Sequence, residues 1–476
     1  MPTRRTASPI RSWETPRSSL SGPNNANSSP APLHQRILLP SSATATKSPR
    51  ILHSSAHSTL DPLLLDLIAL ALRAYVTPWY NGSISRDPDK DFLRAVTTVL
   101  VHVVQALEVR LAALDWVQLV TRDVPDLLAA HYEDWDIAHE RAEGEAAERL
   151  FDHLQSHIAV SLSAPFTEST STPTSPIAAS VDKVYLRTLV DQLLKLLLPP
   201  EDLHAETERA IVREILVGVV FGTVYNRVTQ PWFLHGLIAK QLEAHEIQPR
   251  KTPVADSLAQ DSAPAGSTGI AGMISNVGSH LVSAVAAVFS FAFSGTPTLP
   301  ADPPTTKSPI HEPSLALARA VLPRSALLDQ LLRTLYLPLF LLSTPLDALV
   351  SSFVRTRLAT ESTARAVLQG AIRGMFPHEG WPAPKEEDPD DEGREELKRR
   401  CEEALARTLP ESLPGLLFPS LPTPSEPPDS LAPRLRLAQH LLRPLASHTA
   451  NVHFFVSLID LVVGKVFPEL LVAPLD

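Results

Sequence analysis

Apolar runs of helix length that stop at prolines restrict the fold of this sequence more than any other feature. Residues 61–76 are apolar almost all round, as in a helix buried on most sides, and Pro78 follows them. Proline accounts for 45 of 476 residues, close to twice its usual share of about 5%. Glycine is scarce and Leu and Ala are abundant, which disfavours a β-sandwich or a nucleotide-binding α/β fold. The sequence therefore predicts an all-α protein whose helices are separated by proline-rich connectors.

A first helical block is expected over residues 58–247. Asp87-Pro88 opens a long helix, and Asp123 with Pro125 stands where the N-cap and first turn of the next helix belong, which then runs to about His157. Residues 161–180, rich in Ser, Thr and Pro, are expected to form a loop. Further helices are expected at about 181–198, 204–226 and 231–246. The long helix carries one apolar face, made by Phe92, Val96, Val99, Leu100, Val103, Leu107, Leu111 and Leu114.

A second helical block is expected over residues 315–474. It shows no internal repeat at a fixed period and no coiled-coil heptads. Its helices are expected at about 314–322, 325–354, 360–375, 393–408, 431–446 and 449–471.

Long Pro/Ser-rich segments flank and separate the blocks, and we expect them to be disordered. They are a tail at residues 1–57 and a linker at residues 248–314. The linker holds an apolar segment, 267–295, that water would not solvate well. This segment either inserts in a membrane or lipid droplet, or docks across a groove between the blocks. Its candidate lipid contacts are Leu281, Val282, Val285, Val288, Phe289, Phe291 and Phe293.

Charge and motifs exclude several classes of protein. The net charge of −10 gives no basic footprint for nucleic acid. The single cysteine excludes an internal disulfide and a Cys-based zinc site. No nucleophile elbow, P-loop, dinucleotide fingerprint or zinc-protease motif occurs, so we expect a protein that is not an enzyme and holds no cofactor or metal. His139-Glu140, His245-Glu246 and His311-Glu312 are interpreted as surface pairs.

Two stretches resemble known domains. Pro78-Trp79-Tyr80, Ser85, the helix from Phe92 to Arg110, then Asp123 and His131, resemble the PXA domain of sorting-nexin-related proteins. Residues 185–202 and 213–233, followed by Ile238, are similar to that domain's closing helices. Residues 376–382, 396–417, Arg436 to Arg443 and 451–470 resemble the nexin C-terminal domain of the same proteins. Asn451, Asp460 and the ending Phe467-Pro468-Glu469-Leu470 are the most telling part.

This resemblance implies a function and a shape. It implies that the two blocks pack into one elongated helical unit with an apolar groove suited to lipid. It also implies peripheral association with organelle membranes from the cytoplasm, at the endoplasmic reticulum, at endosomes or vacuoles, or at lipid droplets. No PX or RGS domain is seen between the blocks, so recognition of a phosphoinositide head group by a PX domain is not expected. No N-terminal pair of membrane helices is seen, so stable tethering by such helices is not expected either.

Aromatic and apolar positions in three helices are candidate lipid or membrane contacts. Trp79 and Tyr80, and likewise Trp232 and Phe233, follow a proline and would line a groove mouth or pack at a helix corner. Leu335, Leu339 and Phe340 belong to a run that is apolar on all sides. Arg110, inside another apolar run, is expected to pair with Asp115 or Asp123.

The residues favour a non-catalytic protein that binds glycerolipid or fatty acyl chains, and transfer of these chains is a further expectation. The chains would lie in an apolar groove with their head groups near water. A helical trafficking scaffold that holds an organelle-membrane protein partner without lipid is the alternative.

Overall fold

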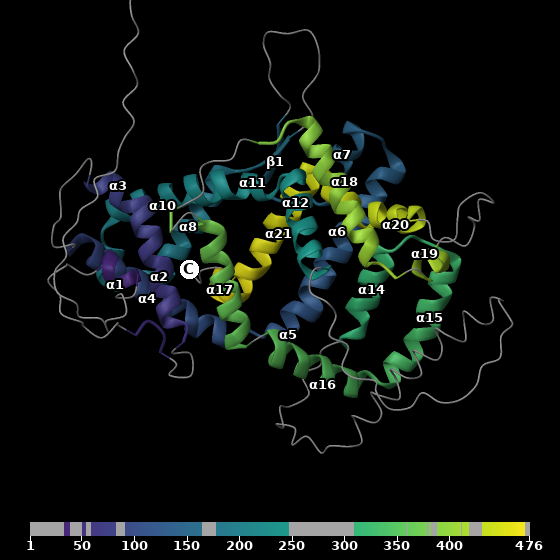
Figure 1. Ribbon diagram of the computed structural model, residues 1–476, viewed down its shortest axis with the longest axis horizontal. Helices are drawn as coiled ribbons and strands as arrows, with labels where there is room; N and C mark the ends of the chain where they lie inside the picture. Colours follow the sequence, from purple (N-terminus) through teal and green to yellow (C-terminus); the bar gives the residue numbers. More distant parts are fainter. Residues whose placement is uncertain are drawn as a thin grey trace, which may run out of the picture.

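The computed structural model describes 33–38, 50–53, 59–81, 91–163, 178–246, 309–358, 360–377, 380–381, 388–410, 412–417 and 431–471. The predicted all-α class is confirmed: within these residues the structure is helical apart from two four-residue strands. The helices form an elongated body with its long axis horizontal in Figure 1. Residues 33–38 form a helix, although the sequence predicts disorder throughout 1–57.

The first helical run continues past Pro78. Helix α2 passes through the π-helical turn η2 into α3, because Pro78 takes a first-turn position of α3, where its missing N–H is not needed. Leu65, Ile68 and Ala69 pack with Leu38 of α1 and Leu93 of α4 in one core cluster. The bounds are α1 Leu33–Leu38, α2 Asp61–Ala71, η2 Leu72–Val76, α3 Thr77–Trp79 and α4 Asp91–Ala113.

The helix expected from Asp123 to His157 is two helices. Gly144, at φ +56°, breaks it in a backbone conformation that L side chains rarely adopt. Asp123 does not act as the N-cap, because the chain is already helical there; Asp115 caps this region by accepting from the Gln118 N–H. The bounds are α5 Trp116–Gln118, η4 Leu119–Asp123, α6 Val124–Arg141 and α7 Glu145–Leu154.

The expected Ser/Thr/Pro loop contains an antiparallel ladder at its ends. Val160 lies opposite Val181 and Ser163 opposite Ala178, which the sequence did not predict because the strands are short and rich in Ser and Ala. The remaining elements of the first half are β1 Val160–Ser163, β2 Ala178–Val181, α8 Lys183–Leu197, α9 Pro200–Leu203, α10 Glu206–Leu216, η5 Val217–Tyr225, α11 Asn226–Val228 and α12 Pro231–Glu246.

The helix expected over 325–354 is also two helices, α15 and α16, bent by 87°. Pro345 has no N–H to donate to the carbonyl of Leu341, so the hydrogen-bond ladder of α15 ends there. The second half holds α14 His311–Val321, α15 Ala326–Leu341, α16 Ser343–Phe353, η6 Val354–Leu358, α17 Glu361–Met375, α18 Asp391–Thr408, α19 Ser412–Leu417, α20 Ala432–Leu442, η7 Arg443–Ala446, α21 His448–Val466 and η8 Pro468–Leu470.

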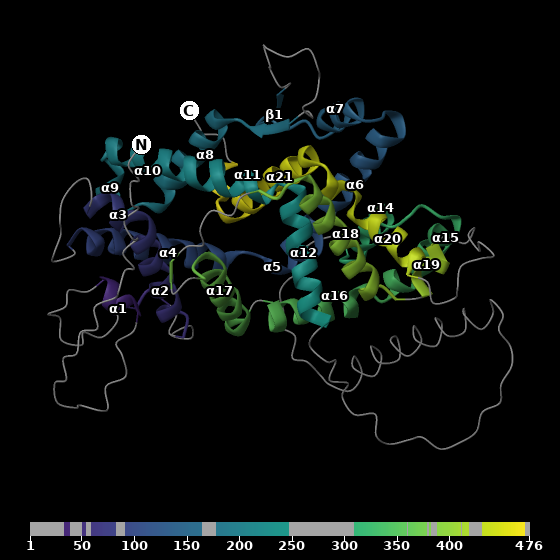
Figure 2. The same cartoon turned by 45° about the horizontal axis from the view of Figure 1, so that its top comes forward.

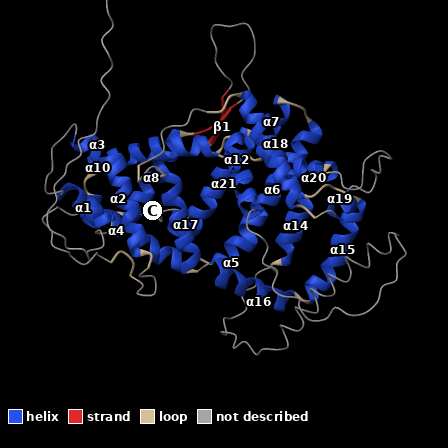
Figure 3. Cartoon of the chain, viewed as in Figure 1, coloured by secondary structure: helices blue, strands red, loops and turns tan. Residues whose placement is uncertain are grey.

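The two halves share their cores. Val452 and Val456 of α21 pack with Ala159, Ala179 and Tyr225 of the first half. Helix α12 lies along α18, and α14 lies along α6. In Figures 1 and 2 the yellow α21 runs through the middle of the body, between elements of the first half. Figure 3 shows that the body around this junction is helical apart from the β1–β2 pair. The predicted packing of the blocks into one elongated unit is therefore confirmed.

Hydrogen bonds and an ion pair of polar side chains join the two halves. The Arg443 guanidinium donates to both carboxylate oxygens of Asp136, at 2.8 and 2.9 Å, and to the Ala320 and Val321 carbonyls. The buried Asn451 amide donates to the Thr229 and Leu445 carbonyls. Such fully paired polar groups fix the relative position of the halves more than they add stability.

Candidate functional site

Helix α4 is long and apolar but poorly covered. It runs for 23 residues, and Leu93 is its single buried residue. In its most apolar stretch of 18 residues, 6% are buried. Val109 is 62% exposed. Phe92, Val96 and Leu100 of the expected face pack against the α2 cluster, as do Val101 and Val104. Toward the end of α4, Val109 and Leu111 remain exposed.

The helices after α14 are similarly uncovered. Leu328 is the one buried residue of α15, and α16 and α17 have none. On α15, one stripe at helical spacing is exposed throughout: Arg333, Tyr336, Leu337, Phe340 and Leu341. A stripe of this kind normally faces a protein core. Here it faces outward.

These elements lie in one row. In Figure 1, α4, α5, α16 and α15 follow one another along the lower edge of the body, and α5 contacts η6 at the end of α16. We call the exposed apolar side chains of this row the apolar rim. Its members are Val109, Leu111, Trp116, Val120, Tyr336, Leu337, Phe340, Leu341 and Phe353.

By length and composition alone, α4 and α21 could each cross a membrane, and the bent pair α15–α16 could be a third span, among the helices that the structure describes. Helix α21 instead packs against the first half of the chain. Its window is 44% buried, and its Asp460 accepts from the Tyr185 hydroxyl and lies 2.9 Å from His157 Nε2. These contacts make α21 the central helix of the junction. The uncovered apolar helices are therefore α4, α15 and α16.

The structure does not gather the candidate aromatic positions into one site. Helices α3, α12 and α15 lie at the left, centre and right of the body in Figure 1, and Figure 2 agrees. Tyr80 stacks on Phe92 with ring centroids 3.9 Å apart. Trp232 is buried, with its ring edge-on to Phe233. Tyr80 and Trp232 both lie at helix corners.

Phe340 is the candidate that joins the apolar rim. It is 50% exposed and stacks on Tyr336, while Leu335 and Leu339 are half-buried on the same helix. For Trp79 the structure describes the backbone, in α3. The seven candidates of the linker, Leu281, Val282, Val285, Val288, Phe289, Phe291 and Phe293, lie outside the described residues.

Arg110 pairs with a residue that the sequence did not suggest. Its guanidinium lies 2.6 Å from Glu469 and over the ring of Phe467, at 4.6 Å. It also donates to the Val466 carbonyl. The expected pairing with Asp115 or Asp123 was wrong. Those residues are near Arg110 in the sequence, whereas the actual partner lies at the end of the second half, which packs against α4.

His311 and Cys401 are both buried. His311 was interpreted as a surface residue, but it is buried beneath Tyr336 and Phe340. Burial raises the pKa of the Cys401 thiol to about 11, so this cysteine is held as the unreactive thiol. Among the described residues, no group of three or more His, Cys, Asp or Glu side chains could hold a metal.

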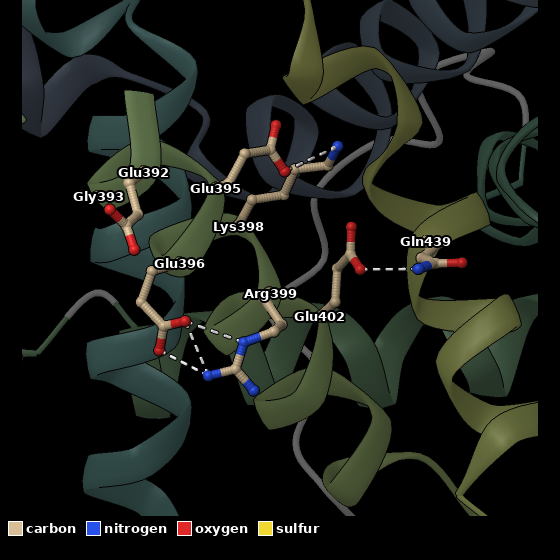
Figure 4. A pocket seen from close by; sticks show the side chains of 8 residues that line it. All are labelled: Glu392, Gly393, Glu395, Glu396, Lys398, Arg399, Glu402 and Gln439. Carbon is tan, nitrogen blue, oxygen red and sulfur yellow. Dashed lines mark hydrogen bonds and ion pairs between the residues drawn. The ribbon is translucent and has the colours of Figure 1, made fainter. Parts of the chain in front are cut away.

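A hollow of about 790 Å³ on α18 and α20 is polar (Figure 4). Arg399 pairs with Glu396 at 2.7 Å, and the Gln439 amide donates to Glu402 at 2.8 Å. Because the lining side chains are charged or amides, apart from Gly393, this hollow is poorly suited to a lipid chain.

The fold and the apolar rim thus define an all-α protein with incompletely covered apolar helices. The PXA domain family matches residues 57–241, against the predicted 58–247. This stretch, which is less than half of the chain, is similar to the PXA domain that sorting-nexin-related proteins carry.

Three curated proteins show the relationship. Sorting nexin-25 of Mus musculus is 26% identical over 188 residues, which cover 39% of this chain and 20% of that protein. PXA domain protein 1 of Schizosaccharomyces pombe is 28% identical over 204 residues, covering 42% and 37%. Sorting nexin-13 of Mus musculus is 24% identical over 183 residues, covering 37% and 18%. The chain thus spans between 18% and 37% of the length of these relatives. No solved structure matches the chain.

Sequence reasoning missed most of the apolar rim. Val109, Leu111, Trp116, Val120 and Phe353 were not candidates, because apolar residues at helical spacing were assigned to a core. The available signal was an apolar residue outside the predicted face of α4, Val109.

Proposed function

We propose that this chain is a non-catalytic protein of membrane trafficking that binds the acyl chains of glycerolipids or fatty acids along its apolar rim. The observation that carries the proposal is α4, a 23-residue apolar helix with one buried residue. Two of the relatives are sorting nexins, sorting nexin-25 and sorting nexin-13, which supports the trafficking role.

The physical argument rests on exposed apolar area. Covering a large apolar side chain is worth about 1.5–3 kcal/mol, and soluble monomers rarely expose large apolar patches. The rim carries nine such side chains on contiguous elements. Acyl chains lying against it would cover this area, while their head groups stay in water.

The nexin C-terminal identity of residues 315–474 belongs to the same proposal. It is supported by the contacts of the motif residues. Asn451 binds the Thr229 carbonyl, Asp460 accepts from Tyr185, and Glu469 pairs with Arg110, so each motif residue joins the second half to the PXA region. As part of the proposal, the protein acts from the cytoplasm, peripherally on organelle membranes such as the endoplasmic reticulum, endosomes or vacuoles, and lipid droplets.

Native mass spectrometry of the purified full chain tests the proposal. We expect mass adducts that correspond to phospholipid or fatty acid, because the apolar rim would retain them. Substituting Val109, Leu337 and Phe353 together by Ser should reduce the adducts. Val184, Ile211 and Val224 are similarly exposed but lie off the rim, and their Ser triple variant is the matched control. A bare polypeptide would favour the protein-binding scaffold instead.

A further inference from the structure

Residues 326–375 combine exposed apolar side chains with exposed arginines. We call them the docking segment; they comprise α15, α16, η6 and α17. In the described part of the segment, Leu328 and Val354 are the buried residues. A stretch with so little burial is held by its helical hydrogen bonds and by contacts of α15 with α14 and α19, of η6 with α5 and of α17 with α2. It therefore offers a surface to another component.

The charge of the docking segment is opposite to that of the whole chain. It contains five arginines and three acidic residues, which gives +2, whereas the chain carries −10. Two of the acids are engaged: Asp329 pairs with Arg319 at 3.1 Å, and Asp347 accepts from the Ile310 N–H at 3.0 Å.

Four of the segment's five arginines are exposed and have no ion-pair partner within the described residues. Arg333, Arg355, Arg365 and Arg373 form no ion pair with any residue that the structure describes. Most other arginines of the second half are paired, as in Arg399 with Glu396 and Arg443 with Asp136. Among the described arginines of the second half, those without an ion pair therefore lie where apolar side chains are also exposed.

Placement along the helices mixes the two chemistries. Arg333 begins the exposed stripe that Tyr336, Leu337, Phe340 and Leu341 continue. Arg355 follows Phe353, which is 59% exposed. On α17, Arg365 and Arg373 flank Val367, which is 65% exposed. Interfacial segments have this composition, since aromatic and aliphatic side chains enter the head-group boundary and arginines bind anionic head groups.

We propose that the docking segment seats the protein on the surface of an anionic phospholipid bilayer. The arginines contact head-group phosphates and carboxylates, and the exposed apolar side chains enter the boundary between head groups and acyl chains. This inference deepens the proposed function, on which it rests for membrane association, and it names the lipid class that the membrane must contain.

Vesicle cosedimentation of the full chain tests the inference. We expect binding to phosphatidylcholine vesicles that contain phosphatidylserine, weaker binding to phosphatidylcholine alone, and a loss of the difference at high salt. Reversing Arg333, Arg355, Arg365 and Arg373 to Glu should weaken binding to the phosphatidylserine vesicles by about a hundredfold or more, since each cation near such a surface contributes about fivefold.

A matched variant separates the local effect from the effect of net charge. Arg141, Arg149, Lys183 and Lys240 are also exposed and form no ion pair within the described residues, but they lie in or at the start of α6, α7, α8 and α12. Their fourfold change to Glu alters the charge equally and should leave binding within about twofold. Equal losses in both variants, or no loss in either, would overturn the inference.

Two further measurements keep the outcomes distinct. If the Glu variant loses its helical circular dichroism, the fourfold change to Gln replaces it and should still abolish the preference for phosphatidylserine. Native mass spectrometry of the same variant should still show bound lipid, because the rim is intact. Lost vesicle binding with retained lipid adducts supports the docking segment, whereas absent adducts in the unaltered protein would refute the proposed function separately.

Discussion

Buried histidines at the junction make the folded state sensitive to acid. His131, on α6, is 4% exposed and lies between the rings of Phe151 and Phe454. Burial lowers the pKa of His131 to about 4, and the nearby His453 lowers it further, against a hydrogen bond with Gln155. Burial lowers the pKa of His453 too. Both side chains are therefore neutral in the folded protein.

We expect the free energy of unfolding to fall as the pH drops from about 6.5 toward about 4. In this range the unfolded chain binds a proton at His131 and the folded protein does not, so acid favours unfolding. His131→Phe should remove a loss on the order of 3 kcal/mol, measured by urea unfolding across this range. His153→Phe, at an exposed position of α7, is the control. An unchanged pH slope in His131→Phe would rule out this role.

At the scale of elements, glycine and proline set the breaks that periodicity hides. Gly144 separates α6 from α7 at φ +56°, with open space where a Cβ would be. Gly370 has the same open space but lies inside α17 without a positive φ. The two positions therefore differ in backbone conformation and not in packing.

Substituting each glycine by alanine should give opposite signs. Gly144→Ala should lower the free energy of unfolding by about 1–3 kcal/mol, because an L residue is strained at a positive φ with ψ −132°. Gly370→Ala should raise it by about 0.5–1 kcal/mol, since alanine favours the helix. Thermal unfolding of both variants measures the difference. Two shifts of the same sign would show that α6 and α7 are not separated by this backbone conformation.

The helices were predictable from apolar periodicity, but their breaks and their coverage were not. The expected 360–375, 393–408 and 449–471 agree closely with α17, α18 and α21. The bend between α15 and α16 depends on Pro345, which has no N–H to continue the hydrogen-bond ladder of the helix. Apolar periodicity gives no information on such a break. Whether α4 is covered depends on what packs beside it, and that is a tertiary property.

At the scale of the whole molecule, the two halves are one folding unit. Their cores are shared, and Tyr132 of α6 donates to the Leu441 carbonyl while Tyr225 of η5 donates to the Val452 carbonyl. The sequence singled out Asn451, Asp460 and Glu469 by resemblance. The structure supplies the physical reason for each, since their partners lie in the other half.

Cleaving the linker should leave the halves together. A protease site inserted within residues 247–308 lies between the described halves, and after cleavage the two fragments should co-elute on size exclusion. Arg443→Ala removes the bidentate pair with Asp136 and leaves that carboxylate half-buried, so the cleaved variant should separate more readily in urea. Arg407→Ala, whose partner Glu403 lies on the same helix, is the control. Immediate separation of the unaltered cleaved fragments would contradict a shared core.

Photo-crosslinking with a diazirine-bearing phospholipid tests the central claim most directly. The purified chain is irradiated with the probe, and crosslinked peptides are mapped by mass spectrometry. Acyl chains bound along the apolar rim should label α4 and α15–α16, and the label should be competed by unmodified phospholipid. Labelling that is absent, that resists competition, or that falls mainly on the polar face of α18 would contradict the account.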